Sequence, residues 1–226
     1  MIIRTTAACA VLAAIAISAS FAQAQSADAR RRAAVRKFTD LVSRHPMADV
    51  SQGMVAMTVR DHLVLDFVDG DNRLARMNQA AAVGYFDRPG CGLCPVLSIS
   101  VPYLLDRRAG DDAIMLVLWH EYQHIVAIEE GRRPPTLHMP LRIGEPVSAA
   151  LVELLVEEEL QVYEAEYRLA AFLGWQPNDA YFHAYHDHGR AAMACMLIEE
   201  YVTLPLYKGH DATLAKVVER FVNEEP

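Results

Sequence analysis

The sequence predicts an α+β protein that is mostly helical, with a small sheet in its first half. Two observations predict this fold class. Before residue 102, short segments alternate apolar and polar residues as β-strands do. From Asp111 onward, apolar residues instead recur at helical spacing. About 200 residues can bury a full hydrophobic core without help from disulfides, so a single domain is expected.

The first 24 residues have the pattern of a secretory signal peptide. Arg4 precedes an apolar run over 7–17, and Ala22-Gln23-Ala24 forms a small-residue cleavage site. The run is short for a membrane anchor, and no later segment approaches the length of a transmembrane helix. We therefore expect a signal peptide over 1–24, one domain over 25–226, a periplasmic or secreted location, and no membrane attachment after cleavage.

The chain is acidic, with 21 Lys and Arg residues against 29 Asp and Glu residues, a formal net charge of −8. Binding to nucleic acid or to an anionic membrane surface needs clustered positive charge. The composition therefore argues against both kinds of partner.

The first part of the mature chain is expected to form one helix and four strands. Phe38, Leu41 and Val42 recur with Val35 at helical spacing, and Pro46 ends that helix. The strands are expected over 54–59, 62–68, 81–86 and 96–101, with a loop over 89–95.

The remainder is expected to be helical. A helix runs from Asp111 to about Glu130 and is stopped by Gly131, and a loop over 131–146 follows. A long helix then begins at Pro146 and ends near Gly174. Two further helices are expected over 178–207 and 210–222.

Cys91 and Cys94 are spaced to form a local disulfide, which an oxidising compartment permits. A thioredoxin-like redox motif would lie between a strand and a helix, whereas here Pro95 and a strand follow. A structural disulfide is therefore favoured over a thiol-disulfide function. Cys195 lies in an apolar stretch and is expected to be a buried thiol.

His120-Glu121-Tyr122-Gln123-His124 is an H-E-x-x-H motif in the middle of a predicted helix. Residues four apart share a helix face, so His120 and His124 can reach one metal ion. Glu121 lies about 100° around the helix, where it can hold a water without binding the metal. The alternative is a solvated face with coincidental histidines, which the surrounding apolar residues disfavour.

A catalytic zinc site takes three protein ligands, so one more must come from elsewhere. Glu159 is favoured because it lies within the apolar face of the long helix, where a carboxylate needs a partner. Glu158 and Glu166 remain alternatives, and Glu166 is favoured as a hydrogen-bond partner of a ligand or of the backbone. The other carboxylates of this helix are expected to face solvent: Glu153, Glu157 and Glu164.

This arrangement resembles the gluzincin metallopeptidases, with H-E-x-x-H on one helix and a Glu on a second. Glu159-Leu-Gln-Val-Tyr163 resembles their E-x-x-A-D motif, with Val162 and Tyr163 in place of Ala and Asp. The segments 84–87 and 96–101 resemble the sheet beside the active helix of minimal gluzincins. The resemblance covers about residues 81–170, and within it only H-E-x-x-H is specific.

The resemblance implies a zincin-like fold and a zinc-dependent peptidase acting on peptides or proteins. His120, His124 and Glu159 would bind Zn²⁺, and Glu121 would be the general base. A catalytically inactive binding protein on the same scaffold is the alternative. The intact Glu121 favours the enzyme.

A peptidase also needs a hydrogen-bond donor for the oxyanion that develops on the scissile carbonyl. The histidine-rich segment 181–188 offers candidates for this donor. Tyr185 and His186 are the candidates, while a second metal site or an exposed polar helix start would also explain the segment. Glu199 and Glu200 are expected on a solvated helix face. The pattern leaves the oligomeric state open.

Overall fold

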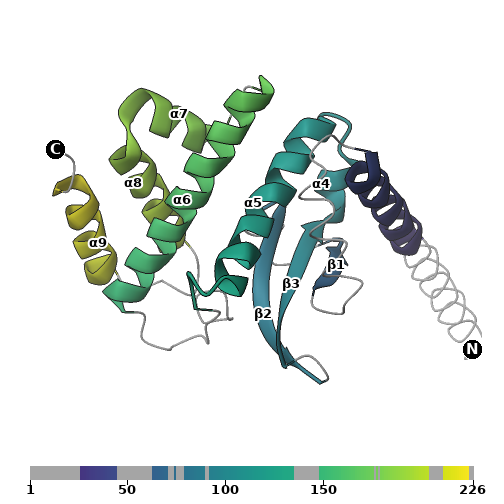
Figure 1. Ribbon diagram of the computed structural model, residues 1–226, viewed down its shortest axis with the longest axis horizontal. Coiled ribbons are helices and arrows are strands. Elements are labelled where there is room, and N and C mark those ends of the chain that lie inside the picture. Colours follow the sequence, from purple (N-terminus) through teal and green to yellow (C-terminus); the bar gives the residue numbers. More distant parts are fainter. Residues whose placement is uncertain are drawn as a thin grey trace, which may run out of the picture.

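A computed structural model gives the arrangement of the chain. It describes residues 26–44, 63–70, 74, 79–89, 92–134, 148–175, 177, 179–203 and 211–223. The described part is mostly helical with a small sheet, as the sequence predicts. Figure 1 shows the sheet beside α5, with α6 on the other side of that helix and α8 and α9 beyond it.

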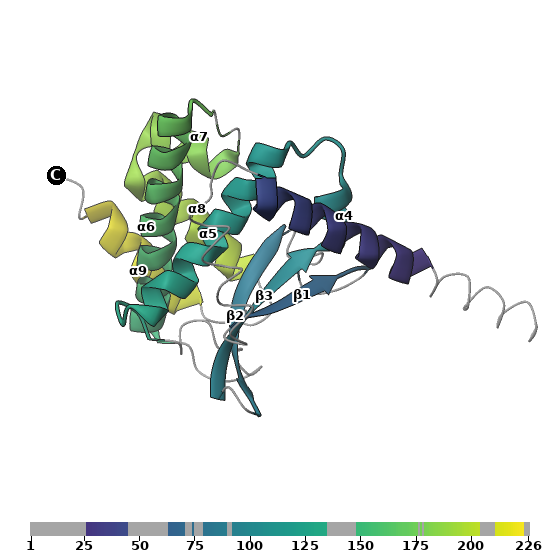
Figure 2. The same cartoon turned by 45° about the vertical axis from the view of Figure 1, so that its right-hand side comes forward.

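A helix over 26–44 (purple in Figure 2) packs against the sheet and confirms the first predicted element. The rings of Phe38 and Phe67 meet edge to face, with 5.5 Å between their centroids. Ala34 is fully buried, whereas Val35 is 40% exposed. Phe38, Leu41 and Val42 are buried as predicted, so the prediction is wrong only for Val35, whose place in the buried stripe is taken by Ala34.

The sheet has the strand order β1-β3-β2 among the described residues. Its central strand β3 pairs in parallel with β1 and antiparallel with β2. The pairing of Arg88 with Gly92 makes β2 and β3 a hairpin, so the connection is shorter than the predicted loop over 89–95. The strand expected over 54–59 lies outside the described residues. The strand bounds are Val64–Val68 for β1, Ala81–Arg88 for β2 and Gly92–Ser100 for β3.

The cysteines follow the prediction in part. Cys94 is fully buried in β3 and is disulfide-bonded, while its expected partner Cys91 lies outside the described residues. Cys195 is a free thiol but is only partly buried, and burial and then the charge of Glu199 raise its pKa.

A short helix, α4 (Val101–Leu105), was not predicted. It begins because the Ser100 side chain accepts a hydrogen bond from the Tyr103 backbone N–H and a proline occupies the first turn. α5 (Asp111–Glu129) follows and packs on β2, with Asp111 and Asp112 in its first turn. Gly131, at φ 71°, follows its last turn as predicted.

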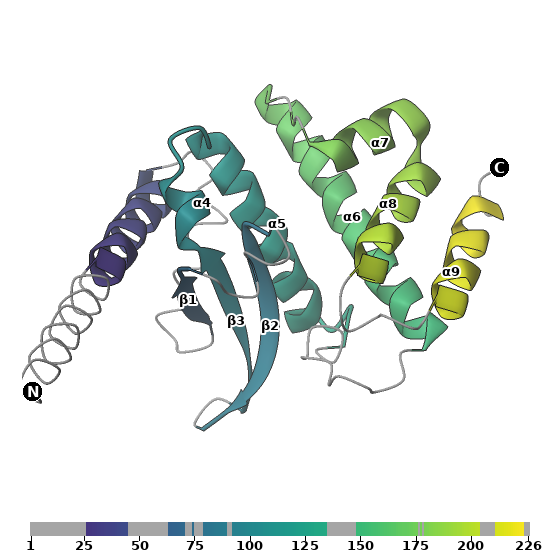
Figure 3. The same ribbon diagram turned by 180° about the vertical axis from the view of Figure 1, so that it is seen from behind.

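α6 (Ala149–Leu173) is the long helix expected after Pro146. It begins three residues later because the Ser148 side chain caps it by accepting from the Leu151 backbone N–H. It ends at Gly174, whose φ of 73° is left-handed. α5 therefore lies between the sheet and α6, which Figure 3 shows from behind.

The helix predicted over 178–207 is wrong, because the chain forms two helices there. α7 (Ala180–His188) ends at Gly189, whose φ of 85° few other residues adopt, and α8 (Arg190–Thr203) starts directly after it. α9 (Asp211–Asn223) agrees with the last predicted helix. Among described helices, none is long and apolar enough to cross a membrane.

Two apolar clusters lie on either side of the contact between α5 and α6. The first joins the N-terminal helix, the sheet, α4 and α5, and contains Leu97 and Leu118. The second joins α6 with α7, α8 and α9, and contains Val156 and Ile198. Most of the buried polar residues lie between the two clusters: His120, His124, Glu158 and Glu166.

The acidic residues expected on the solvent side of α6 instead pair with arginines, which corrects the prediction. Arg190 on α8 donates to Glu157 at 2.8 Å and to Glu164 at 3.1 Å. Arg220 on α9 pairs with Glu153. These ion pairs fix α8 and α9 against α6.

We expect Arg190→Ala to lower the free energy of unfolding by about 1 kcal/mol, because the guanidinium joins two half-buried carboxylates. Urea unfolding followed by circular dichroism measures the change. Arg132→Ala is the matched control, since Arg132 pairs with Glu130 at the surface, and it should stay within about 0.5 kcal/mol of wild type. Equal losses in both variants would contradict a role for Arg190 in helix docking.

Candidate metal centre

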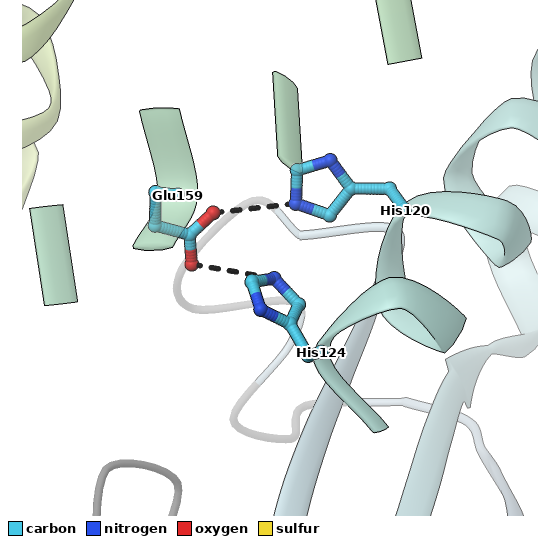
Figure 4. Close-up of side chains that lie close together, drawn as sticks. All are labelled: His120, His124 and Glu159. Carbon is cyan, nitrogen blue, oxygen red and sulfur yellow. Dashed lines mark hydrogen bonds and ion pairs between the residues drawn. The ribbon is translucent and has the colours of Figure 1, made fainter. Parts of the chain in front are cut away.

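Two helices bring the predicted metal ligands together. His120 and His124 lie one turn apart on α5 and face Glu159 on α6 (Figure 4). His120 Nε2 is 3.2 Å from Glu159 Oε2, and His124 Nε2 is 3.7 Å from Glu159 Oε1.

These three residues offer ligand atoms that all lie within 4.8 Å of one another. In a tetrahedral site with bonds of about 2.0–2.1 Å, neighbouring ligand atoms are about 3.3 Å apart. The spacing of the imidazole and carboxylate atoms therefore fits one metal ion shared by His120, His124 and Glu159.

The other ring nitrogens of the two histidines are held by further carboxylates. His120 Nδ1 is 2.9 Å from Glu166 Oε2, and His124 Nδ1 is 3.1 Å from Glu158 Oε1. All four side chains are buried, with Glu158 only 2% exposed. A carboxylate that accepts from Nδ1–H directs Nε2 toward the metal position and makes it a better ligand.

Glu158 and Glu166 thus lie behind the histidines, and Glu159 is the carboxylate that both histidines face. The hydrogen bond to a ligand that the sequence favours for Glu166 is present. The matching contact of Glu158 was missed. Its adjacency to Glu159 was the available signal, because adjacent side chains point about 100° apart and can contact two different residues of one neighbouring helix.

Glu121 lies beside the metal ligands without belonging to their group. Its Oε2 accepts a hydrogen bond of 2.8 Å from the Val83 backbone N–H in β2. Burial raises the pKa of Glu121, while His124 and His120 act in the opposite direction. The backbone contact fixes the orientation of the carboxylate next to the two imidazoles.

A cavity of about 300 Å³ opens beside this centre. His120, Glu121 and Glu159 line it, and its other walls come from the segment before β2, from α6 and from α7 and α8. Further lining residues are Gln79, Tyr163, Glu166, Asp179, Tyr181 and Glu200.

Tyr185 and His186 are not among the residues that line this cavity. Tyr185 packs on Tyr167, with 5.9 Å between ring centroids. His186 is exposed, stacks on Phe182 and contacts Asp187 at 2.9 Å. The packing of α7 on α6 decides which of its side chains reach the cavity, and spacing along the chain does not show this packing.

Tyr163 and Tyr181 line the cavity instead, and neither was singled out as a donor. The Tyr163 ring meets that of His120, with 4.4 Å between centroids, and lies 5.2 Å from the ring of Tyr181. Its position one turn after Glu159 was the available signal. The expected solvated position of Glu200 is also wrong, since this residue is half-buried and lines the cavity.

We expect Glu166→Gln to weaken Zn²⁺ binding by about 10–100-fold, because a neutral amide supports the His120 ring less well. Competition with a chromophoric chelator measures the affinity. Glu164→Gln on the same helix is the matched control, because its partner is Arg190 and it should leave the affinity unchanged. Equal zinc affinities of the two variants would contradict a role for Glu166 in supporting the metal site.

A pH dependence is expected after treatment with a chelator. Burial alone lowers the pKa of His120, but hydrogen bonds to Glu159 and Glu166 outweigh it and raise the pKa well above the ordinary value. A raised pKa in the folded state gives stability that is complete below about pH 6.5 and is lost as pH rises through the folded pKa.

The melting temperature of the chelator-treated protein should therefore fall as the pH rises above about 6.5. That of the zinc-saturated protein should fall less, because the metal replaces the protons. Calorimetry on both samples makes the comparison, and parallel curves would contradict the assignment of these histidines to a metal site.

In comparisons with known proteins, no family model, curated protein or solved structure matches the chain.

Proposed function

We propose that the protein is a zinc-dependent peptidase of the gluzincin type with a zincin-like fold. One observation carries this proposal. Both Nε2 atoms of the H-E-x-x-H histidines face one carboxylate, while both Nδ1 atoms are held by others. Carboxylates that hold ligand histidines from behind are a recurrent feature of metal sites.

Zinc is the metal that suits this donor set together with Glu121. Two imidazoles and one carboxylate are also used for iron in oxygenases, but a hydrolase additionally needs a base beside the metal. When bound, zinc would polarise a carbonyl group and make a water more acidic. The remaining chemistry belongs to residues of this chain.

Glu121 would accept a proton from the attacking water and transfer it to the leaving amine. The Val83 N–H holds one carboxylate oxygen, so the side chain needs little reorientation during the reaction. The pKa of Glu121 is raised toward neutral pH. This suits a group that must both accept and release a proton.

Tyr163 and Tyr181 would supply the O–H donors for the developing oxyanion. Both phenols line the cavity that contains Glu121 and Glu159. Burial, and then the charges of Glu159 and Glu166, raise the pKa of Tyr163 well above its usual value, so its O–H remains protonated at neutral pH. Prealigned donors of this kind are usually a large contribution to acyl-transfer catalysis.

The substrate would be a peptide or protein outside the cytoplasm. The signal-peptide pattern over 1–24 supports a periplasmic or secreted location, although that segment lies outside the described residues. The acidic composition supports a protein-type substrate over a nucleic acid.

We expect Glu121→Gln to retain zinc and to lower peptide cleavage by about 10²–10⁴-fold, because it keeps the ligands and removes the base. Metal content by mass spectrometry and cleavage of a mixed peptide library are measured on the same samples. Glu129→Gln on the exposed end of α5 is the matched control and should cleave normally. A wild-type protein without zinc would contradict the proposal, and zinc without cleavage would favour the inactive binding protein.

A further inference from the structure

The cavity beside the metal centre is lined by carboxylates from four directions. Glu121 comes from α5, Glu159 and Glu166 from α6, Asp179 from the start of α7 and Glu200 from α8. Among the described lining residues there is no Lys or Arg. A divalent metal ion would offset the charge of only two of these five groups.

Four of these carboxylates have a role in the site or in the fold. Glu159 faces the metal position, Glu166 holds His120, and Glu121 is oriented by β2. Asp179 caps α7 by accepting from the Phe182 backbone N–H. Glu200 is the lining carboxylate to which the proposed chemistry assigns no role.

Glu200 faces the same space as the metal ligands. Its carboxylate is half-buried, so a positively charged group in the cavity would pair with it at short range.

A second acceptor belongs to Gln79, which also lines the cavity. Gln79 lies in the segment before β2, and its Oε1 is buried without a hydrogen-bond donor among the described residues. Buried polar atoms are rarely left without a partner, so this oxygen calls for a donor from a ligand. An ammonium group offers three donors and no acceptor.

The aromatic walls favour the same kind of ligand. The rings of Tyr163 and Tyr181 line the cavity and lie 5.2 Å apart. The faces of such rings attract cations. Carboxylates, an amide oxygen and aromatic faces together form a site for a positively charged hydrogen-bond donor.

We infer that this cavity binds an ammonium group of the substrate, with Glu200 as the residue that selects it. The inference rests on the proposed peptidase function. The ammonium group is either the free amino terminus of a peptide or the side chain of a lysine, and the two sources have the same chemistry at the binding site.

Three peptides of otherwise identical sequence test the inference. One has a free amino terminus and no basic residue, one is N-acetylated, and one is N-acetylated and contains a single lysine. Their binding to the zinc-loaded Glu121→Gln protein is measured by calorimetry, so that binding is observed without turnover. The free-terminus peptide or the lysine peptide should bind about tenfold more tightly than the uncharged one, and the preferred peptide identifies the source. Equal affinities of all three peptides would overturn the inference.

The Glu200→Gln change, made in the Glu121→Gln protein, should abolish the preference. Glu199→Gln in the same background is the matched control, because this substitution removes the same charge from the exposed neighbouring residue on α8. Preserved preference in the Glu200→Gln protein would overturn the role of Glu200. If that variant does not fold, the three-peptide comparison with Glu200 intact still decides the inference.

Cleavage by the wild-type protein separates this inference from the proposed function. Cleavage of all three peptides at equal rates would retain the peptidase and reject the ammonium site. Tight binding of an ammonium peptide without any cleavage would retain the site and reject the peptidase.

Discussion

The contact between two imidazoles on α5 and three carboxylates on α6 is the interaction on which the rest of the site depends. Charges that are almost fully buried, such as that of Glu158, are tolerated only with close partners. Removing one histidine would leave such a charge without compensation. The five groups therefore fix how α6 is placed along α5, and this placement also brings Tyr163 to the cavity.

The two apolar clusters hold the two halves of this contact separately. The first positions α5 on the sheet, where the backbone of β2 reaches Glu121. The second positions α6 against α8, from which Glu200 reaches the same cavity. The candidate site thus lies at the boundary of two cores, where side chains from both can meet without disrupting either.

The grouping of the candidate metal ligands was predictable because it depends on local helical spacing. His120 and His124 are one turn apart, and Glu159 lies in an apolar stripe of a single helix. The residues that were misplaced depend on how helices pack together. Glu157 pairs with Arg190 on α8, and Tyr181 lines the cavity whereas Tyr185, one turn further along α7, packs on Tyr167 of α6. Spacing along one helix carries no information about these contacts.

The separation of the ligand segments along the chain determines when a metal ion can be taken up. The contacts between the histidines and the glutamates join residues 34 to 46 positions apart. Before α6 docks on α5, the candidate site consequently offers only the two histidines of α5, which are too few to retain an ion firmly against competing chelators. Metal uptake at this site would therefore follow the docking of α6 on α5, and the compartment in which the chain completes its folding would decide which ions it encounters first.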